Sequence, residues 1–362
     1  MNSVTYDLKW VTETTKKLDV LSIDISPNGG LVLTASYTEK CWRTWDCESG
    51  LECMVSEQHN GHRKCTCCVT RSGLLKTFDA ACPVLAHRHN IRVARFSPCG
   101  KTIASGDIAG VVCMSDAKTG KMQFFMGGAD RQVEMLSFSP DGAKLASAGY
   151  DGFIRIWDTS VGGMTSSLLA MGGVPYTALD GALSGDPVTS LHFCPTDSRL
   201  ILSTTDASPF ARTWNVETGL LAHSVNGCEM AFYSPNGQMI ATLLNFWVSI
   251  YQTGTGIVQC RFNSLTARVR HMFFSLDGSK LIVVCGHTNN LMVFDSYTGH
   301  HLTTFLVPGP GRSMCFVMGR DWVDDLQRKE AFAMGHQSRL GEASPYIQAI
   351  DVGVIDTIIA NV

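Results

Sequence analysis

Apolar residues along this chain fall in short runs that turn-forming residues interrupt at regular intervals. The stretches 133–138 and 145–148 are short, rich in apolar residues and bounded by Gly, Pro, Asp or Asn. In the stretch 153–157, Arg155 alternates with hydrophobic neighbours as in a half-buried strand. Short bounded runs and period-two alternation are typical of β-strands rather than helices. The pattern therefore predicts an all-β fold for most of the chain.

One sequence unit recurs along the chain and begins with a Ser-Pro-x-Gly turn. An apolar strand with small residues follows, then a second turn, then a strand that ends in an aromatic residue and an acidic or amide residue. Gly at the fourth turn position suits a tight hairpin because it adopts positive φ without a Cβ clash. The turn occurs as Ser26-Pro27-Asn28-Gly29, Ser97-Pro98-Cys99-Gly100, Ser139-Pro140-Asp141-Gly142 and Ser234-Pro235-Asn236-Gly237, with weaker copies at Cys194-Pro195-Thr196-Asp197 and Ser275-Leu276-Asp277-Gly278.

The ends of these units repeat at intervals of 33, 37, 42, 57, 37 and 43 residues. One unit is too small to bury both faces of its sheet alone, so the units must stack on one another, and radial stacking also protects their edges. The longest interval includes residues 162–186, whose Gly, Ser, Ala and Pro content predicts an extended surface loop. The unit ends are Trp45-Asp46, Phe78-Asp79, Ser115-Asp116, Trp157-Asp158, Trp214-Asn215, Tyr251-Gln252 and Phe294-Asp295.

These units resemble the WD-repeat family of β-propellers over residues 18–306, and the copy at 139–158 is close to the family pattern. The resemblance implies a seven-bladed propeller in residues 1–320, with eight blades as the alternative. The second unit lacks the Ser-Pro-x-Gly turn, so we expect a degenerate repeat there. Either 5–12 or 301–306 can supply the closing strand, and 312–318 can belong to an incomplete eighth blade.

The resemblance also implies a buried hydrogen-bond network formed by a His, a Ser, a turn Asp and the Trp at the strand end. Ser147, Asp151 and Trp157 match three of these positions, and the His position falls near Asp130. His87 and His223 stand where the His of the family is expected, in units that lack the complete set. We expect the matching residues to be structural, because such a network must be fully satisfied to stabilise a sheet.

A partner-binding rim is the functional site that the resemblance implies. Three of its candidate residues lie two positions before the expected starts of innermost strands at 91, 133 and 188, and a fourth precedes the turn at Asp151. Tyr and Arg are enriched among interface hot spots. The candidates are His89, Arg131, Asp186 and Tyr150.

Residues 321–362 differ from the repeats and predict a short helical C-terminal tail. Apolar residues recur at helical spacing in 322–336, and Ser344-Pro345 is suited to open a second helix. The tail is expected either to pack on the propeller as a clasp or to bind a partner. The stretch from Ile350 to Ile359 also faintly resembles the start of an F-box.

Composition excludes several classes of protein. The chain is 45% hydrophobic and 17% charged with a net charge of −3, which is not a disordered composition and makes nucleic acid an unlikely partner. The longest apolar stretch, 239–250, is too short to cross a bilayer, and the first residues do not resemble a secretion signal. The 14 Cys residues are therefore expected to be reduced thiols in the cytoplasm, with the nucleus as the alternative.

Catalytic and metal-binding motifs are sparse. The chain has no phosphate-binding loop with Lys-Ser/Thr and no Gly-x-Ser-x-Gly nucleophile elbow. The Cys- and His-rich stretch 59–89 is expected to be an apolar strand with His-containing loops rather than a zinc site. We therefore expect a non-enzymatic scaffold that binds proteins or peptides, with no cofactor, metal or small-molecule substrate. The alternative is a substrate receptor of a ubiquitin ligase, although Trp45-Asp46 and Trp157-Asp158 lack the Arg of the Trp-Asp-x-Arg end.

Overall fold

The computed structural model describes most of the repeat region and parts of both ends of the chain. The described residues are 8–13, 20–36, 40–56, 87–127, 131–170, 186–206, 208–226, 229–263, 269–275, 277–285, 290–306, 316–317, 331–334 and 346–351. Every regular secondary-structure element within these ranges is a β-strand. The all-β prediction is confirmed for them.

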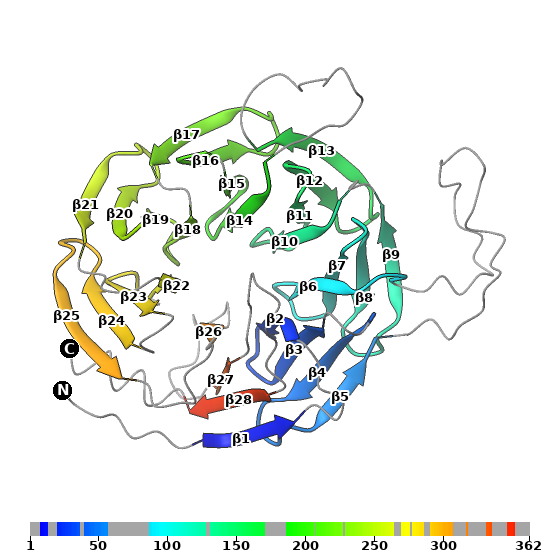
Figure 1. Ribbon diagram of the computed structural model, residues 1–362. Coiled ribbons are helices and arrows are strands. Elements are labelled where there is room, and N and C mark those ends of the chain that lie inside the picture. Colours follow the sequence, from blue (N-terminus) through cyan, green and yellow to red (C-terminus); the bar gives the residue numbers. More distant parts are fainter. Residues whose placement is uncertain are drawn as a thin grey trace.

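The strands form seven four-stranded antiparallel sheets, and six of these are each built from four consecutive strands (Figure 1). Sheet 1 contains β2 (Val20–Ile25), β3 (Leu31–Ser36), β4 (Trp42–Asp46) and β5 (Glu52–Val55), and sheet 2 contains β6 (Ile91–Phe96), β7 (Thr102–Asp107), β8 (Val112–Asp116) and β9 (Met122–Met126). Sheet 3 contains β10 (Val133–Phe138), β11 (Lys144–Gly149), β12 (Phe153–Asp158) and β13 (Met164–Leu169), and sheet 4 contains β14 (Val188–Cys194), β15 (Asp197–Thr205), β16 (Phe210–Asn215) and β17 (Leu221–Asn226). Sheet 5 contains β18 (Met230–Tyr233), β19 (Met239–Leu244), β20 (Trp247–Gln252) and β21 (Val258–Phe262), and sheet 6 contains β22 (Val269–Phe274), β23 (Lys280–Cys285), β24 (Asn290–Asp295) and β25 (His301–Leu306).

These six sheets follow one another around a common centre, with the first strand of each innermost and the fourth outermost (Figure 1). Each innermost strand contacts the next, from β2 through β6, β10, β14 and β18 to β22. Neighbouring innermost strands run in the same direction, because Arg92 near the start of β6 pairs with Glu134 near the start of β10, and Ser137 near the end of β10 hydrogen-bonds Phe193 near the end of β14. All six therefore begin at one edge of the assembly and end at the other.

The apolar core is divided among the interfaces between successive sheets. Between sheets 2 and 3, Val93, Met114 and Leu136 pack with Phe138 and Trp157, and all five are buried. Comparable clusters lie between sheets 1 and 2, 3 and 4, 4 and 5, and 5 and 6. Each small sheet thus obtains its buried face from its neighbours, as expected for stacked repeat units.

The Ser-Pro-x-Gly turns connect the first and second strands of their sheets as predicted. In sheet 3, the Ser139 hydroxyl accepts a hydrogen bond from the amide of Lys144 at 2.9 Å and donates one to Asp141 at 2.6 Å. The amide of Gly142 bonds the carbonyl of Ser139 at 2.8 Å, and Gly142 has a φ of 72°. Positive φ explains the need for Gly at this position.

Sheets 1 and 2 are direct neighbours, which corrects the expected order of the repeats. The Ser22 hydroxyl bonds both the carbonyl and the amide of Ala94, at 3.3 and 3.2 Å, and Asp24 accepts the amide of Phe96 at 2.8 Å. The predicted degenerate repeat that ends at Phe78-Asp79 is therefore wrong as a blade between these two sheets. Those residues lie outside the described part of the chain. Their match depended on one aromatic-Asp pair at the right spacing, without the turn that defines the other units.

Sheet 7 joins the two ends of the chain and corrects the predicted tail. It is ordered β1 (Leu8–Glu13), β28 (Tyr346–Asp351), β27 (Ala331–Met334) and β26 (Phe316–Val317), and β26 and β27 contact β2. Strands stand where helices were predicted in 331–334 and 346–351, so that prediction is wrong for these residues. The other residues of 321–362 are outside the described ranges, and the domain boundary at 320 remains a prediction.

The physical reason for the correction is long-range pairing. Tyr346–Asp351 pairs with Leu8–Glu13, and Phe332 lies opposite Ile350. Hydrogen bonds to a strand from the other end of the chain override a local periodicity that resembled a helix. Both candidates for a closing strand are used: His301–Leu306 is the outer strand of sheet 6, and Leu8–Glu13 belongs to sheet 7.

Candidate partner-binding edge

The candidate binding residues lie at the edge where the innermost strands begin, which we call the rim edge. The structure confirms the predicted starts of β6, β10 and β14 at Ile91, Val133 and Val188. His89, Arg131 and Asp186 each lie two residues before one of these starts, so they occupy three adjacent sheets. His89 and Arg131 are exposed and Asp186 is half-buried.

Tyr150 joins Arg131 at this edge. Tyr150 lies in the turn between β11 and β12, and its amide donates a hydrogen bond at 3.1 Å to the carbonyl of Gln132, the residue after Arg131. Tyr150 is 44% exposed. Within the described ranges Arg131 makes no ion pair. The backbone segments that carry Tyr150 and Arg131 therefore lie next to each other at this edge.

Sheets 2 and 3 hold these residues on a rigid base. Arg92 of β6 and Glu134 of β10 form an ion pair at 2.9 Å, and both side chains are mostly covered. This pair connects the strand after His89 with the strand after Arg131. Asp186 is placed by β14 on the next sheet, where the amide of Asp206 bonds the carbonyl of Pro187 at 3.1 Å.

The predicted network around Trp157 is present in part. The indole of Trp157 donates a hydrogen bond to the Ser147 hydroxyl at 2.9 Å. Asp151 accepts the amide of Phe153 at 3.2 Å and forms an ion pair with Arg155 at 2.6 Å. Arg155 therefore supplies the positive partner for Asp151 in a sheet where the expected His is missing. Equivalent indole bonds join Trp45 to Thr34 at 2.8 Å and Trp214 to Ser203 at 3.0 Å.

A second buried network, which the sequence reasoning did not assign, lies in sheet 2. His87 Nδ1 lies 3.0 Å from Asp107 Oδ2, and His87 Nε2 lies 2.7 Å from the Ser105 hydroxyl. The other oxygen of Asp107 accepts the amides of Ala109 and Val111 at 2.9 Å. The network attaches the segment before β6 to the end of β7.

This Ser-His-Asp arrangement is structural rather than a reaction centre. It has the order of contacts found in a catalytic triad, but the side chains of His87 and Asp107 are 0% exposed and Ser105 is also fully buried. A substrate has no access to them in this arrangement. The sequence signal was His87 before an innermost strand, and Ser115 in the usual place of Trp concealed it. His223 lies in the outer strand β17 and is not its equivalent.

Metal ligands do not gather within the described ranges: no group of three or more His, Cys, Asp or Glu side chains is placed to hold an ion there. His87 of the Cys- and His-rich stretch is already bonded to Asp107 and Ser105. The stretch from His59 to Cys82 falls outside these ranges. The described part of the chain also contains no helix long and apolar enough to cross a membrane.

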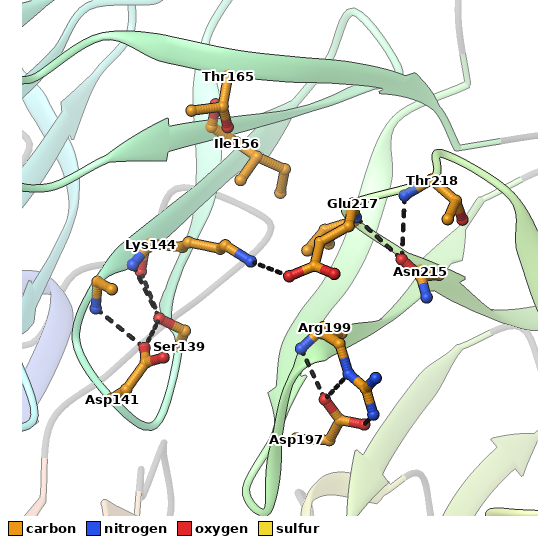
Figure 2. A network of polar contacts seen from close by, with 12 residues as sticks. Ser139, Asp141, Lys144, Ile156, Thr165, Asp197, Arg199, Asn215, Glu217 and Thr218 are labelled. Carbon is orange, nitrogen blue, oxygen red and sulfur yellow. Dashed lines mark hydrogen bonds and ion pairs between the residues drawn. The ribbon is translucent and has the colours of Figure 1, made fainter.

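The opposite edge, where the innermost strands end, differs in its polar groups, and we call it the turn edge. Lys144 of sheet 3 pairs with Glu217 of sheet 4 at 3.2 Å, and Arg199 pairs with Asp197 at 2.9 Å (Figure 2). Asn215 accepts the amides of Glu217 and Thr218 at 3.0 and 3.1 Å (Figure 2). The charged side chains drawn there are bonded to one another or to nearby backbone.

In sheets 1, 2, 3 and 6 the third strand ends in an Asp that caps the second turn at this edge. Asp158 accepts the hydroxyl and the amide of Ser160 at 2.6 and 2.8 Å, and these bonds lower the pKa of the Asp158 carboxyl. Asp116 accepts the hydroxyl and amide of Thr119 in the same way, at 2.8 and 2.7 Å. The acidic residue of the repeat therefore has a local structural role.

Known proteins share this repeat. The WD domain, G-beta repeat family matches residues 120–158, from the turn before β9 to the end of β12. WD repeat-containing protein 1 of Rattus norvegicus is 33% identical over 84 residues, which is 22% of this chain and 14% of that protein. WD repeat-containing protein SL1-17 of Schistosoma mansoni is 28% identical over 167 residues, which is 40% of this chain and 52% of that protein. WD repeat-containing protein 25 of Mus musculus is 36% identical over 77 residues, covering 21% of this chain and 14% of that protein.

The matches thus span about half of these relatives' length or less. They agree with the six consecutive four-stranded antiparallel sheets and with the indole-hydroxyl bonds that recur in sheets 1, 3 and 4. Residues 120–158 are therefore similar to the WD domain, G-beta repeat family.

Proposed function

We propose that this chain is a non-enzymatic scaffold that binds other proteins or peptides at the rim edge of a closed, seven-bladed propeller. WD-repeat proteins generally act as platforms for protein interaction, and a rigid ring suits this role because it displays many independent loops. The fold alone does not name a partner. The residues at the rim edge therefore have to support the proposal.

The seven-bladed ring is supported by the way the two ends of the chain meet. Sheet 7 takes β1 from the beginning of the chain and β26 to β28 from the end, and it lies against β2. A closed ring leaves no innermost strand without a neighbour on either side. We therefore favour seven blades over eight, with sheet 7 as the blade that links sheet 6 to sheet 1.

The observation that carries the proposed function is the pair Arg131 and Tyr150. Both side chains are exposed, they stand on adjacent backbone segments joined by a hydrogen bond, and Arg131 has no ion partner in the described ranges. Arg and Tyr are frequent interface hot spots, where truncation costs about 2 kcal/mol or more. His89 and Asp186 extend the surface to sheets 2 and 4.

The test replaces both residues and compares captured partners. We expect Arg131→Ala combined with Tyr150→Ala to remove a major partner in affinity purification with mass spectrometry, while the melting temperature changes little because both side chains are exposed. The matched control is Arg199→Ala with Tyr297→Ala, which removes an exposed Arg and an exposed Tyr from the turn edge. The control should keep the partner.

Survival of the full partner list in the rim variant would place the binding face elsewhere. Recovery of ubiquitin ligase subunits with the wild-type protein would instead favour the substrate-receptor alternative. The eight cysteines in the described ranges are free thiols, which supports a reducing compartment, the cytoplasm or alternatively the nucleus.

A further inference from the structure

An arginine lies over an aromatic ring in three consecutive sheets, next to the turn between the second and third strands. In each case the aromatic residue is the first residue of the third strand, β12, β16 or β20. Such cation–π contacts are favourable and orient the guanidinium group. The pairs are Arg155 over Phe153 at 5.5 Å, Arg212 over Phe210 at 5.9 Å and Arg261 over Trp247 at 4.6 Å, measured to the ring centroid.

Arg155 and Arg212 occupy the same position in sheets 3 and 4. Each is the third residue of its strand, and each lies opposite the Ser that accepts the Trp indole bond: Ser147 for Arg155 and Ser203 for Arg212. Their partners differ. Arg155 is neutralised by Asp151, two residues before Phe153, at 2.6 Å. Ser208 stands two residues before Phe210 in sheet 4.

Arg212 is therefore a guanidinium without a counter-ion in the described part of the chain. Its hydrogen bond is from Nη1 to the carbonyl of Ala170 at 3.4 Å. The side chain is partly withdrawn from water, and this desolvation lowers the pKa of Arg212, although an arginine remains protonated at neutral pH. A partly buried charge without a partner gains most when an opposite charge arrives.

Arg212 is connected to the rim edge through Ala170. The amide of Ala170 bonds the carbonyl of Gly152 at 3.0 Å, and Gly152 belongs to the same turn as Tyr150. Ala170 thus links the Tyr150 turn on one side to Arg212 on the other. Phe210, over whose ring Arg212 lies, is 39% exposed, and Tyr150 in the linked turn is 44% exposed.

We propose that Arg212 and Phe210 extend the rim onto sheet 4 and bind the carboxylate of an Asp or Glu that is flanked by apolar residues in a partner peptide. This inference rests on the proposed function and adds the chemistry of the partner. In sheet 3 the same position is occupied internally by the carboxylate of Asp151. In sheet 4 the partner supplies it.

A carboxylate fits this position better than a phosphate. A single guanidinium matches one negative charge, as the Arg155–Asp151 pair shows. Asp186 and Asp206 lie at the same edge of sheet 4, where the amide of Asp206 bonds Pro187. Their negative charges oppose a dianionic phosphate more strongly than a carboxylate.

The experiment selects peptides from a phage-displayed library of random sequences on the immobilised full chain. Wild-type protein should enrich sequences with Asp or Glu beside aromatic or aliphatic residues. Arg212→Gln keeps a polar side chain without the charge, and it should lose this enrichment and bind a synthetic wild-type-selected peptide about tenfold more weakly or worse. Arg261→Gln removes the corresponding charge beside Trp247 in sheet 5 and should behave like wild type.

The outcomes separate this inference from the proposed function. Absence of acidic enrichment on wild type, or equal binding by Arg212→Gln at an unchanged melting temperature, overturns the carboxylate site. Stronger binding of a peptide with phosphoserine in place of its acidic residue overturns it in favour of phosphate. If the carboxylate site fails but Arg131→Ala with Tyr150→Ala still loses a protein partner, the proposed rim stands. If the binding of acidic peptides depends on Arg212 and the Arg131→Ala, Tyr150→Ala double variant keeps all its partners, the carboxylate site is supported. The proposed role of Arg131 and Tyr150 is then overturned.

Discussion

The two edges of the six consecutive sheets use the same repeat for different purposes. At the turn edge, Ser139, Asp141 and Asp158 bond the backbone of their own turns, and Lys144 pairs with Glu217 of the next sheet. At the rim edge, His87 and Asp107 are buried in a network, and the exposed Arg131 makes no ion pair within the described part of the chain. Side chains that stabilise a tight turn by hydrogen bonds within that turn are not free to bind a partner. The rim edge is therefore the one at which we propose that a partner binds.

The largest expected effect tests the buried support of the rim edge. His87→Ala leaves the Ser105 hydroxyl and one side-chain oxygen of Asp107 buried without the hydrogen bonds that His87 makes, and each such loss costs about 1–3 kcal/mol in the free energy of unfolding. Chemical denaturation measures this loss. His89→Ala, two residues away on an exposed side chain, should leave the free energy of unfolding within about 0.5 kcal/mol of wild type. Equal stability of the two variants would contradict the role of the network.

The next effect tests the turn edge. Ser139→Ala removes the hydroxyl that bonds Lys144 and Asp141, and we expect a loss of about 1–2 kcal/mol because the backbone amide of Lys144 loses a buried acceptor. Binding of partners should not change, because this turn lies away from Arg131 and Tyr150. Ser160→Ala, which removes an exposed hydroxyl from the second turn of the same sheet, should cost less. A loss of partner binding in Ser139→Ala would contradict the view that the turn edge is structural and the rim edge binds partners.

The smallest effect concerns the acidic caps of the turn edge. The hydrogen bonds from Ser160 lower the pKa of Asp158 in the folded chain, so its stabilising effect is complete above the unfolded pKa and is lost as pH falls through the folded value, below about pH 4. Asp158→Asn keeps the acceptor oxygen, as Asn215 does naturally in sheet 4. Unfolding curves between pH 7 and pH 3 should therefore show a slightly shallower acid decline for Asp158→Asn. Identical declines would mean that Asp158 is not stabilised as a carboxylate.

Local features of the sequence predicted the parts of the site that depend on neighbours in the chain. The starts of β6, β10 and β14 were predicted correctly because each of these strands precedes a Ser-Pro-x-Gly turn or its weaker copy, so counting five residues back from the Phe before the turn gives the first residue of the strand. The bond between Trp157 and Ser147 also followed from the repeat, since both residues are placed by adjacent strands of one hairpin.

Residues without a complete motif were harder to interpret. His87 was not assigned because Ser115 stands where the motif requires Trp, although Ser105 and Asp107 were in place. The pairing of Arg155 with Asp151 was missed because the family pattern places a His before the innermost strand as part of this network. In sheet 3 the partner of Asp151 is instead an Arg on the third strand. In both cases the contacts formed because the side chains have suitable charges or hydrogen-bonding groups at neighbouring positions, although the family motif is incomplete.

The sequence by itself determined the strands and turns of the six consecutive sheets, because these depend on contacts between residues that are close in the chain. The tertiary structure decided the order of the sheets and the state of the tail. Ser22 and Asp24 bond Ala94 and Phe96 across the boundary between sheets 1 and 2, which left no place for a blade between them. Tyr346–Asp351 became a strand because Leu8–Glu13 from the other end of the chain offers its backbone hydrogen-bonding groups. Such pairings satisfy backbone groups that local periodicity does not describe, and only the folded chain brings them together.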